Sequence, residues 1–201
     1  MIIAFDFETS GLPLFNERSV DPRQPHIVEM ALIEYGDDGV EVGYERVIVR
    51  PDGWTIGADM TAIHGISHEQ AMDEGIPENN AVAMFLIAMA RTSLRVAHNE
   101  SFDRRIARIA MSRAGYQRSL IEFIEAQPAF CTCNSSKAIV NAPPTERMIA
   151  KGMNGPKPPN LGEAVKHFFP DEEITGLHGA LADARYAGRI YHHLRSIGKA
   201  T

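Results

Sequence analysis

The first eight residues constrain the fold more than any other stretch of the chain. An apolar run from Met1 to Phe5 suits a buried β-strand, and Asp6 and Glu8 follow it two residues apart. Side chains two apart in a strand point to the same face, so these carboxylates lie side by side and repel each other. A divalent metal with hard oxygen ligands, Mg²⁺ or Mn²⁺, would offset that repulsion. A turn cap or a pair with an arginine is the alternative that this stretch allows.

Length and composition favour a single α/β domain over residues 1–201. The chain is long enough for one full core, and its 44% apolar and 23% charged residues are ordinary for a globular protein. The sequence has no apolar stretch long enough to span a bilayer, and it has no signal-peptide pattern. We therefore expect a cytoplasmic protein without membrane contact. The formal net charge of -6 argues against a protein that coats nucleic acid. It allows an enzyme that holds a few nucleotides through metal ions.

The hydrophobic pattern predicts a mixed sheet with helices. Strands are expected at 1–8, 27–35 and 40–49 as an antiparallel meander, and at 94–97 and 129–131. Helices are expected at 60–66, 79–91, 100–114, 119–125, 134–140, 161–169 and 179–194. Asn99 and Asn160 stand where they can cap two of these helices. The proline- and glycine-rich segment 141–159 is predicted to be a surface loop.

Four carboxylates fall at the ends of these predicted elements. Asp6 and Glu8 end the first strand, and Asp103 lies one turn into the helix after the fourth. Asp183 falls in the first turn of the last helix, five residues after His178. If the first and fourth strands are neighbours, these ends meet at one edge of the sheet, where ligands bind in open α/β sheets. Taken singly, each residue also fits a solvated helix face or a surface histidine, so the interpretation depends on the set.

Three short motifs contain these acids. They are Asp-x-Glu-Thr-x-Gly-Leu at residues 6–12, His-Asn-x-x-Phe-Asp at residues 98–103, and His-x-Ala-x-x-Asp-Ala at residues 178–184. All three resemble the motifs of the DEDDh branch of the metal-dependent 3′-to-5′ exonucleases. The motifs stand in the family's order and span nearly the whole chain. The resemblance implies the ribonuclease H-like fold, a three-layer α/β architecture with a mixed five-stranded sheet and helices on both faces. The loop at 141–159 resembles that of phage-type members.

The resemblance also implies a mechanism with two Mg²⁺ or Mn²⁺ ions, about 3.5 to 4 Å apart. Asp6 would bridge both ions, while Glu8 and Asp183 would hold the ion that carries the attacking water. Asp103 would act on the other ion through water. His178 would take the proton from the attacking water, a role that suits the pKa of histidine near neutrality.

Six further residues are expected around the terminal nucleotide because of the same resemblance. Leu12 would wedge against a base. His64 either edges the nucleotide pocket or is a structural histidine, and Phe102 either packs beneath the substrate or belongs to the core. The expected substrate-binding residues are Thr9, Gly11, Leu12, His64, Asn99 and Phe102.

Seven arginines cluster in sequence around the second motif. They form either a basic track for the incoming strand or a solvated charged helix face. They are Arg91, Arg95, Arg104, Arg105, Arg108, Arg113 and Arg118.

The sequence therefore predicts an exonuclease that releases nucleoside monophosphates from the 3′ end of single-stranded DNA. RNA or short oligoribonucleotides are the alternative substrates, since no residue recognisably reads a 2′-hydroxyl. A third hypothesis is a non-catalytic module that docks on a polymerase or repair complex. Mutually repelling acids argue against that hypothesis, because a binding module does not need them. The exonuclease hypotheses also allow a polymerase or repair complex as a protein partner.

Overall fold

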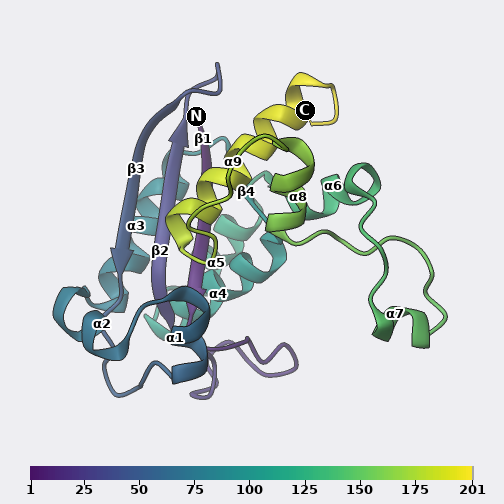
Figure 1. Ribbon diagram of the computed structural model, residues 1–201. Helices are drawn as coiled ribbons and strands as arrows, with labels where there is room; N and C mark the ends of the chain where they lie inside the picture. Colours follow the sequence, from purple (N-terminus) through teal and green to yellow (C-terminus); the bar gives the residue numbers. More distant parts are fainter. Residues whose placement is uncertain (201) are drawn as a thin grey trace.

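A five-stranded mixed sheet forms the centre of the computed structural model, which describes residues 1–200 (Figure 1). The strand order is β3-β2-β1-β4-β5. The strands are β1 (Ile2–Thr9), β2 (Ile27–Tyr35), β3 (Glu41–Ile48), β4 (Leu94–Ala97) and β5 (Ala129–Cys131). β1 pairs antiparallel with β2 and parallel with β4, so it is the central strand, as predicted.

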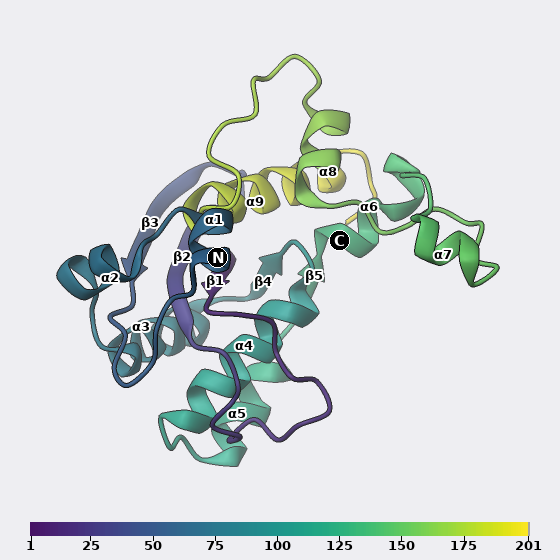
Figure 2. The same ribbon diagram turned by 60° about the horizontal axis from the view of Figure 1, so that its bottom comes forward.

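Helices cover both faces of this sheet, which gives the expected three layers (Figures 1 and 2). One core joins the sheet to α3, α4 and α5, and a second joins it to α8 and α9. The helices are α1 (Ala58–His64), α2 (His68–Glu74), α3 (Glu78–Arg91), α4 (Glu100–Arg113), α5 (Arg118–Glu125), α6 (Thr132–Val140), α7 (Glu146–Ala150), α8 (Leu161–Phe168) and α9 (Ala180–Ser196). Between residues 1 and 200, no helix has both the length and the apolar character needed to cross a membrane.

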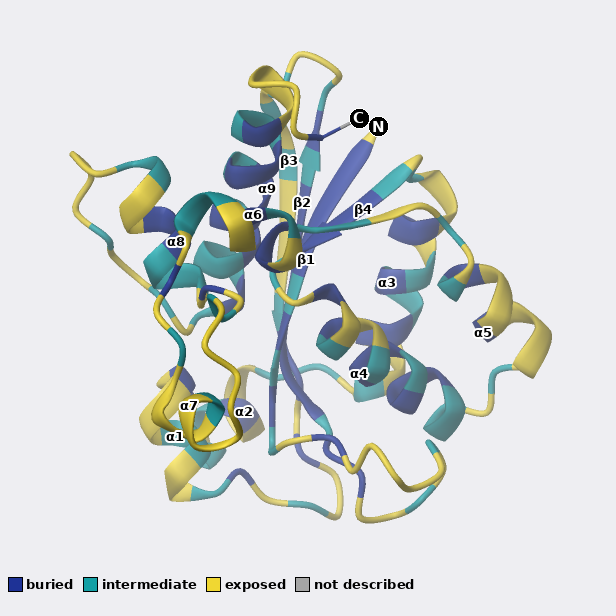
Figure 3. Ribbon diagram, turned by 90° about the vertical axis from the view of Figure 1, so that its right-hand side faces the viewer, coloured by how far each residue is buried: buried dark blue, intermediate teal, exposed yellow. Residues whose placement is uncertain are grey.

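Alternate side chains of β1 enter the two cores. Ile3, Phe5 and Phe7 pack on the side of α3 and α4, while Ile2 and Ala4 pack against α9. Figure 3 shows the buried interior along these strands and the exposed outer surfaces of α5 and α7. Asp6 and Glu8 continue the series that faces α9, because side chains alternate along a strand. They therefore emerge at the edge of the sheet where α9 begins.

Two short helices were not predicted. α2 buries only Ala71, and α7 buries none of its residues, so neither leaves a periodic apolar pattern in the sequence. Each begins at a hydroxyl N-cap: Ser67 accepts from the N–H of Gln70, and Thr145 accepts from the N–H of Met148. Segment 141–159, expected to be a loop, thus contains one helical turn.

The two expected asparagine caps differ. Asn160 accepts from the N–H of Glu163, whose carboxylate accepts from the N–H of Asn160 in return, which makes a capping box. Asn99 stands at the N-cap position of α4 in the left-handed region, with a φ of 72°. Its side chain caps no N–H of that helix and accepts instead from the hydroxyl of Ser101 at 3.3 Å. The prediction of a capping side chain at Asn99 is therefore wrong, although the helix does start there.

Candidate active site

Three carboxylates meet at the edge of the sheet where β1 ends. Oxygen atoms of Asp6, Glu8 and Asp183 all lie within 4.8 Å of one another. Asp183 comes from the first turn of α9, whose small residues Ala180 and Ala184 are fully buried against the sheet. These small residues allow α9 to approach β1 closely. Clustered carboxylate oxygens are the ligands that Mg²⁺ and Mn²⁺ prefer, so the donor set fits the expected metal.

Asp103 lies deeper, on the side of β1 that faces β4. Its side chain is 2% exposed, and its Oδ1 accepts from the N–H of Phe7 at 3.2 Å. β4 pairs with β1 only as far as Val96 opposite Ala4, so this N–H lies beyond the last parallel pair. Asp103 satisfies it, and α4 thereby holds a carboxylate next to Asp6.

Burial raises the pKa of these carboxyl groups, and mutual repulsion raises it further. The pKa of Glu8 rises to about 7 and that of Asp183 to about 6, with burial as the largest cause of each. Burial and then the charge of Asp103 raise the pKa of Asp6 well above its ordinary value. A bound cation would stabilise the ionised forms and reverse these shifts. A metal ion at this site would therefore reduce the repulsion between the carboxylates.

These pKa shifts predict that the metal-free protein loses stability as the pH rises. Glu8 and Asp183 bind protons more tightly when the chain is folded, so the free energy of unfolding falls between about pH 4 and pH 7. We expect the Tm of EDTA-treated protein to be about 5 °C lower at pH 7.5 than at pH 5. Excess Mn²⁺ at pH 7.5 should raise it again. Glu8→Gln should flatten the pH dependence, and a Tm that ignores both pH and Mn²⁺ would contradict the assignment.

His178 lies in the turn before α9. Its backbone is left-handed, with a φ of 67°, and its N–H donates to Oδ1 of Asp183 at 3.3 Å. The residue is exposed, and the hydrogen bond from its backbone N–H partly offsets the rise in the pKa of Asp183. An exposed imidazole beside a carboxylate cluster can exchange a proton with a water molecule there.

Three of the residues that are predicted to contact the nucleotide lie at the end of β1 and in the turn after it. Thr9 is buried and its hydroxyl donates to the carbonyl of Gly11 at 2.8 Å, which fixes the turn. An added Cβ at Gly11 would meet nothing within 4 Å, so the space beside this backbone is open. Leu12 follows with 79% of its surface exposed. A side chain that is apolar and this exposed is available to contact a base.

His64 is buried at the end of α1, and the structure leaves one of its nitrogens free. Its Nδ1 accepts from the N–H of Ile66 at 3.2 Å, so the hydrogen of the neutral ring is on Nε2. That Nε2 is buried and has no hydrogen-bond partner among residues 1–200. Burial lowers the pKa of this histidine. The bond to Ile66 gives His64 a structural role, and the pocket role of its Nε2 stays a prediction.

The remaining two expected contacts come from the start of α4. Asn99 is exposed. Phe102 is partly buried and packs against the core of α3, α4 and α5. Phe102 thus contributes to the core, as one of its two interpretations predicted, and the substrate contacts of both residues stay predictions.

His98, the first residue of the second motif, connects three parts of the chain. Its Nδ1 lies 2.9 Å from the hydroxyl of Thr132, and its Nε2 donates to the carbonyl of Pro159 at 3.0 Å. Burial lowers its pKa to about 4, so the ring is neutral. The residue ties the end of β4 to the starts of α6 and α8. The sequence did not indicate this structural role.

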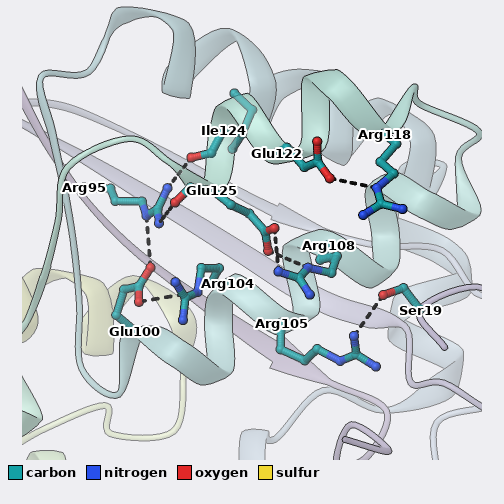
Figure 4. A network of polar contacts seen from close by, with 10 residues as sticks. All are labelled: Ser19, Arg95, Glu100, Arg104, Arg105, Arg108, Arg118, Glu122, Ile124 and Glu125. Carbon is teal, nitrogen blue, oxygen red and sulfur yellow. Dashed lines mark hydrogen bonds and ion pairs between the residues drawn. The ribbon is translucent and has the colours of Figure 1, made fainter. Parts of the chain in front are cut away.

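Six of the seven arginines around the second motif are paired with acids, and four of these pairs join different elements. Arg95 is 2% exposed and donates to Glu100 at 3.0 Å, and Arg108 donates through two nitrogens to Glu125 (Figure 4). Arg105 instead donates to the hydroxyl of Ser19 and to loop carbonyls. The other pairs are Arg91 with Glu34, Arg104 with Glu100, Arg113 with Glu78, and Arg118 with Glu122. These ion pairs favour a neutralised helix face over a basic track.

Glu29 is the acid that the sequence analysis missed. It lies on β2 directly opposite Glu8 and is 1% exposed. Its charge adds to the rise in the pKa of Asp6, Glu8 and Asp183. The available signal was a carboxylate flanked by apolar residues near the start of a strand that is almost entirely apolar apart from Glu34 at its far end.

Comparisons with known proteins agree with this geometry. The RNase_T family model, described as an exonuclease, matches residues 3–191. DNA polymerase III subunit epsilon of Rickettsia felis is 28% identical over 193 residues, which cover 96% of this chain and 72% of that protein.

Solved structures show the same ribonuclease H-like fold. E. coli exonuclease I in complex with a dT13 oligonucleotide matches with a TM-score of 0.74 and 17% identity, over 97% of this chain and 41% of that one. The chain thus spans about two fifths of exonuclease I. Exonuclease X in complex with 5′ overhanging duplex DNA matches with a TM-score of 0.65 and 19% identity, over 100% of this chain and 95% of that one. The motifs, the carboxylate site and the family match together establish that the chain belongs to the DEDDh family of 3′-5′ exonucleases.

Proposed function

We propose that this enzyme releases nucleoside monophosphates from the 3′ end of single-stranded DNA by two-metal hydrolysis. The observation that carries the proposal is the cluster of Asp6, Glu8 and Asp183 beside the exposed His178. Single-stranded DNA is the substrate class because the exonuclease I structures of the same fold are complexes with dT13 and dA16. We further propose that the enzyme acts as a single exonuclease domain in the cytoplasm.

The four acidic residues would hold the metal ions of the proposed reaction. Asp6, Glu8 and Asp183 would bind two divalent ions, Mg²⁺ or Mn²⁺, and Asp103 would support the site from the start of α4. When bound, these ions supply positive charge that favours deprotonation of water and offsets charge on the phosphodiester. His178 takes the proton of the attacking water at its imidazole, since it is exposed beside Asp183.

The substrate residues hold the terminal nucleotide against this centre. Leu12 contacts a base with its exposed side chain, and the backbone at Thr9 and Gly11 approaches the 3′-hydroxyl. His64 offers its unpaired Nε2 as a donor. Asn99 and the exposed part of Phe102 complete the set from the start of α4.

Matched oligomers should distinguish the two substrate classes. We expect Mg²⁺ or Mn²⁺ to support stepwise shortening of 5′-labelled single-stranded DNA from its 3′ end, faster than an RNA oligomer of the same sequence. A label on the 3′ nucleotide should be released first as a monophosphate. A faster reaction on RNA would instead support an exoribonuclease or oligoribonuclease of the same family. A blocked 3′-phosphate end is the control that should resist digestion.

A polymerase or repair complex is the proposed protein partner. The support is the similarity to a DNA polymerase III subunit. A non-catalytic accessory module is the remaining alternative. It would be favoured if the purified chain bound Mn²⁺ poorly and shortened neither DNA nor RNA.

A further inference from the structure

Glu29 links β2 to the helix that carries Asp183. It lies inside β2, opposite Glu8, with 1% of its surface exposed. Its Oε2 accepts from the N–H of Ala180 at 2.7 Å, within the buried part of the protein. Ala180 is the first residue of α9, and the N-cap before it is Gly179, which has no side chain to offer. A carboxylate from another element therefore caps this helix.

The second oxygen of Glu29 is held from the other side. Arg46 on β3 donates to Oε1 of Glu29 through its Nε and lies in ion-pair contact through a second nitrogen. Both carboxylate oxygens thus have partners within the protein. The free N–H groups of a helix N-terminus and an arginine side chain both make favourable hydrogen bonds to a carboxylate. With its oxygens engaged in this way, Glu29 is suited to hold structure rather than to ligate a metal.

The hydrogen bond between Glu29 and Ala180 lies close to the proposed catalytic residues. Ala180 lies two residues after His178 and three residues before Asp183. Glu8, a member of the carboxylate cluster, lies directly opposite Glu29 in the pairing of β1 with β2. A bond from β2 to the first turn of α9 therefore sets the distance between the acid of α9 and the acids of β1. It also adds a fifth carboxyl group next to the site.

We propose that Glu29 is a positioning residue that fixes the start of α9, and with it Asp183 and His178, against the carboxylates of β1. This inference rests on the proposed function, since it assigns a role in the same metal site. Loss of the link should leave the fold intact, because the sheet and the core against α9 remain. It should loosen the metal site, because outer hydrogen bonds orient metal ligands.

The direct test is Glu29→Gln, which keeps the shape of the side chain but leaves one acceptor oxygen for two donors. We expect Mn²⁺ affinity, measured by calorimetry without substrate, to fall roughly 10- to 100-fold. The metal concentration that gives half-maximal rate should rise with it, while the KM for the oligonucleotide stays nearly constant. Glu34→Gln is the matched control, since Glu34 lies on the same strand but pairs with Arg91 at the surface. It should leave Mn²⁺ affinity unchanged.

A second variant covers the case in which Glu29→Gln fails to fold. Arg46→Gln removes the guanidinium that holds Oε1 of Glu29 and keeps the carboxylate at Ala180, so we expect a smaller loss of Mn²⁺ affinity. Arg46→Lys, which keeps a positive charge there, should restore part of that affinity. Wild-type Mn²⁺ affinity and kinetics in Glu29→Gln would overturn the inference. Because calorimetry needs no substrate, failure of the proposed nuclease reaction would be seen separately, as wild-type protein that binds Mn²⁺ but cuts nothing.

Discussion

Asp6→Asn is expected to reduce the rate of 3′ hydrolysis by roughly 10³-fold or more, because it removes the carboxylate at the centre of the metal site. The same change should not destabilise the metal-free protein. Burial and the charges of Asp103, Asp183 and Glu8 raise the pKa of Asp6, so its ionised form costs free energy in the fold. A neutral amide of the same shape avoids that cost. Loss of activity with equal or higher stability is the pattern of a functional site.

The measurement pairs digestion of a 5′-labelled single-stranded DNA oligomer with a thermal unfolding scan of the same preparation. Asp37→Asn is the control, since Asp37 is an exposed acid in the turn between β2 and β3. It should leave both rate and Tm unchanged. Asp6→Asn protein that digests DNA at the wild-type rate would remove the metal site from the mechanism. Protein that loses activity and also unfolds several degrees earlier would make Asp6 a structural residue.

The central strand and its two acids were predictable because a strand has a fixed period. Once Ile2 and Ala4 face one core, Asp6 and Glu8 must follow on the same side. The convergence of Asp183 was predictable only through the motif order, since no local rule brings the start of α9 to the end of β1. The prediction of a mixed five-stranded sheet with helices on both faces is confirmed.

The functions of polar side chains between distant elements could not be predicted. Glu29 acts through the register of β2 against β1 and through its bond to Ala180, which is 151 residues away in sequence. Arg108 meets Glu125 because α4 and α5 pack together. Each such pair needs the packed structure, whereas strand period and helix period need only the sequence. The short helices α2 and α7 were not predicted for a different reason: their N-caps are clear, but they bury almost no apolar face.

Burial and hydrogen bonding distinguish the proposed base, His178, from the two other histidines of the motifs and the predicted pocket. His98 is buried, hydrogen-bonded through both nitrogens and kept neutral by its low pKa. His64 is also buried, with one nitrogen occupied by Ile66. His178 is the exposed one of the three, and its backbone N–H donates to Asp183 of the acidic cluster. Of these three histidines, His178 is therefore the one whose ring is open to water beside the carboxylates.

His178→Ala should slow hydrolysis by roughly 10² to 10⁴-fold, the usual loss when a general base is removed. The residue is exposed, so we expect the Tm to stay nearly constant, and its N–H bond to Asp183 belongs to the backbone and survives the change. Mn²⁺ affinity should also survive, which separates this variant from Asp6→Asn. His167→Ala is the control, because His167 is an exposed histidine in the last turn of α8. If His178→Ala digests single-stranded DNA as fast as the wild type, another group must take the proton. If it instead loses Mn²⁺ affinity, His178 shapes the metal site through the turn before α9.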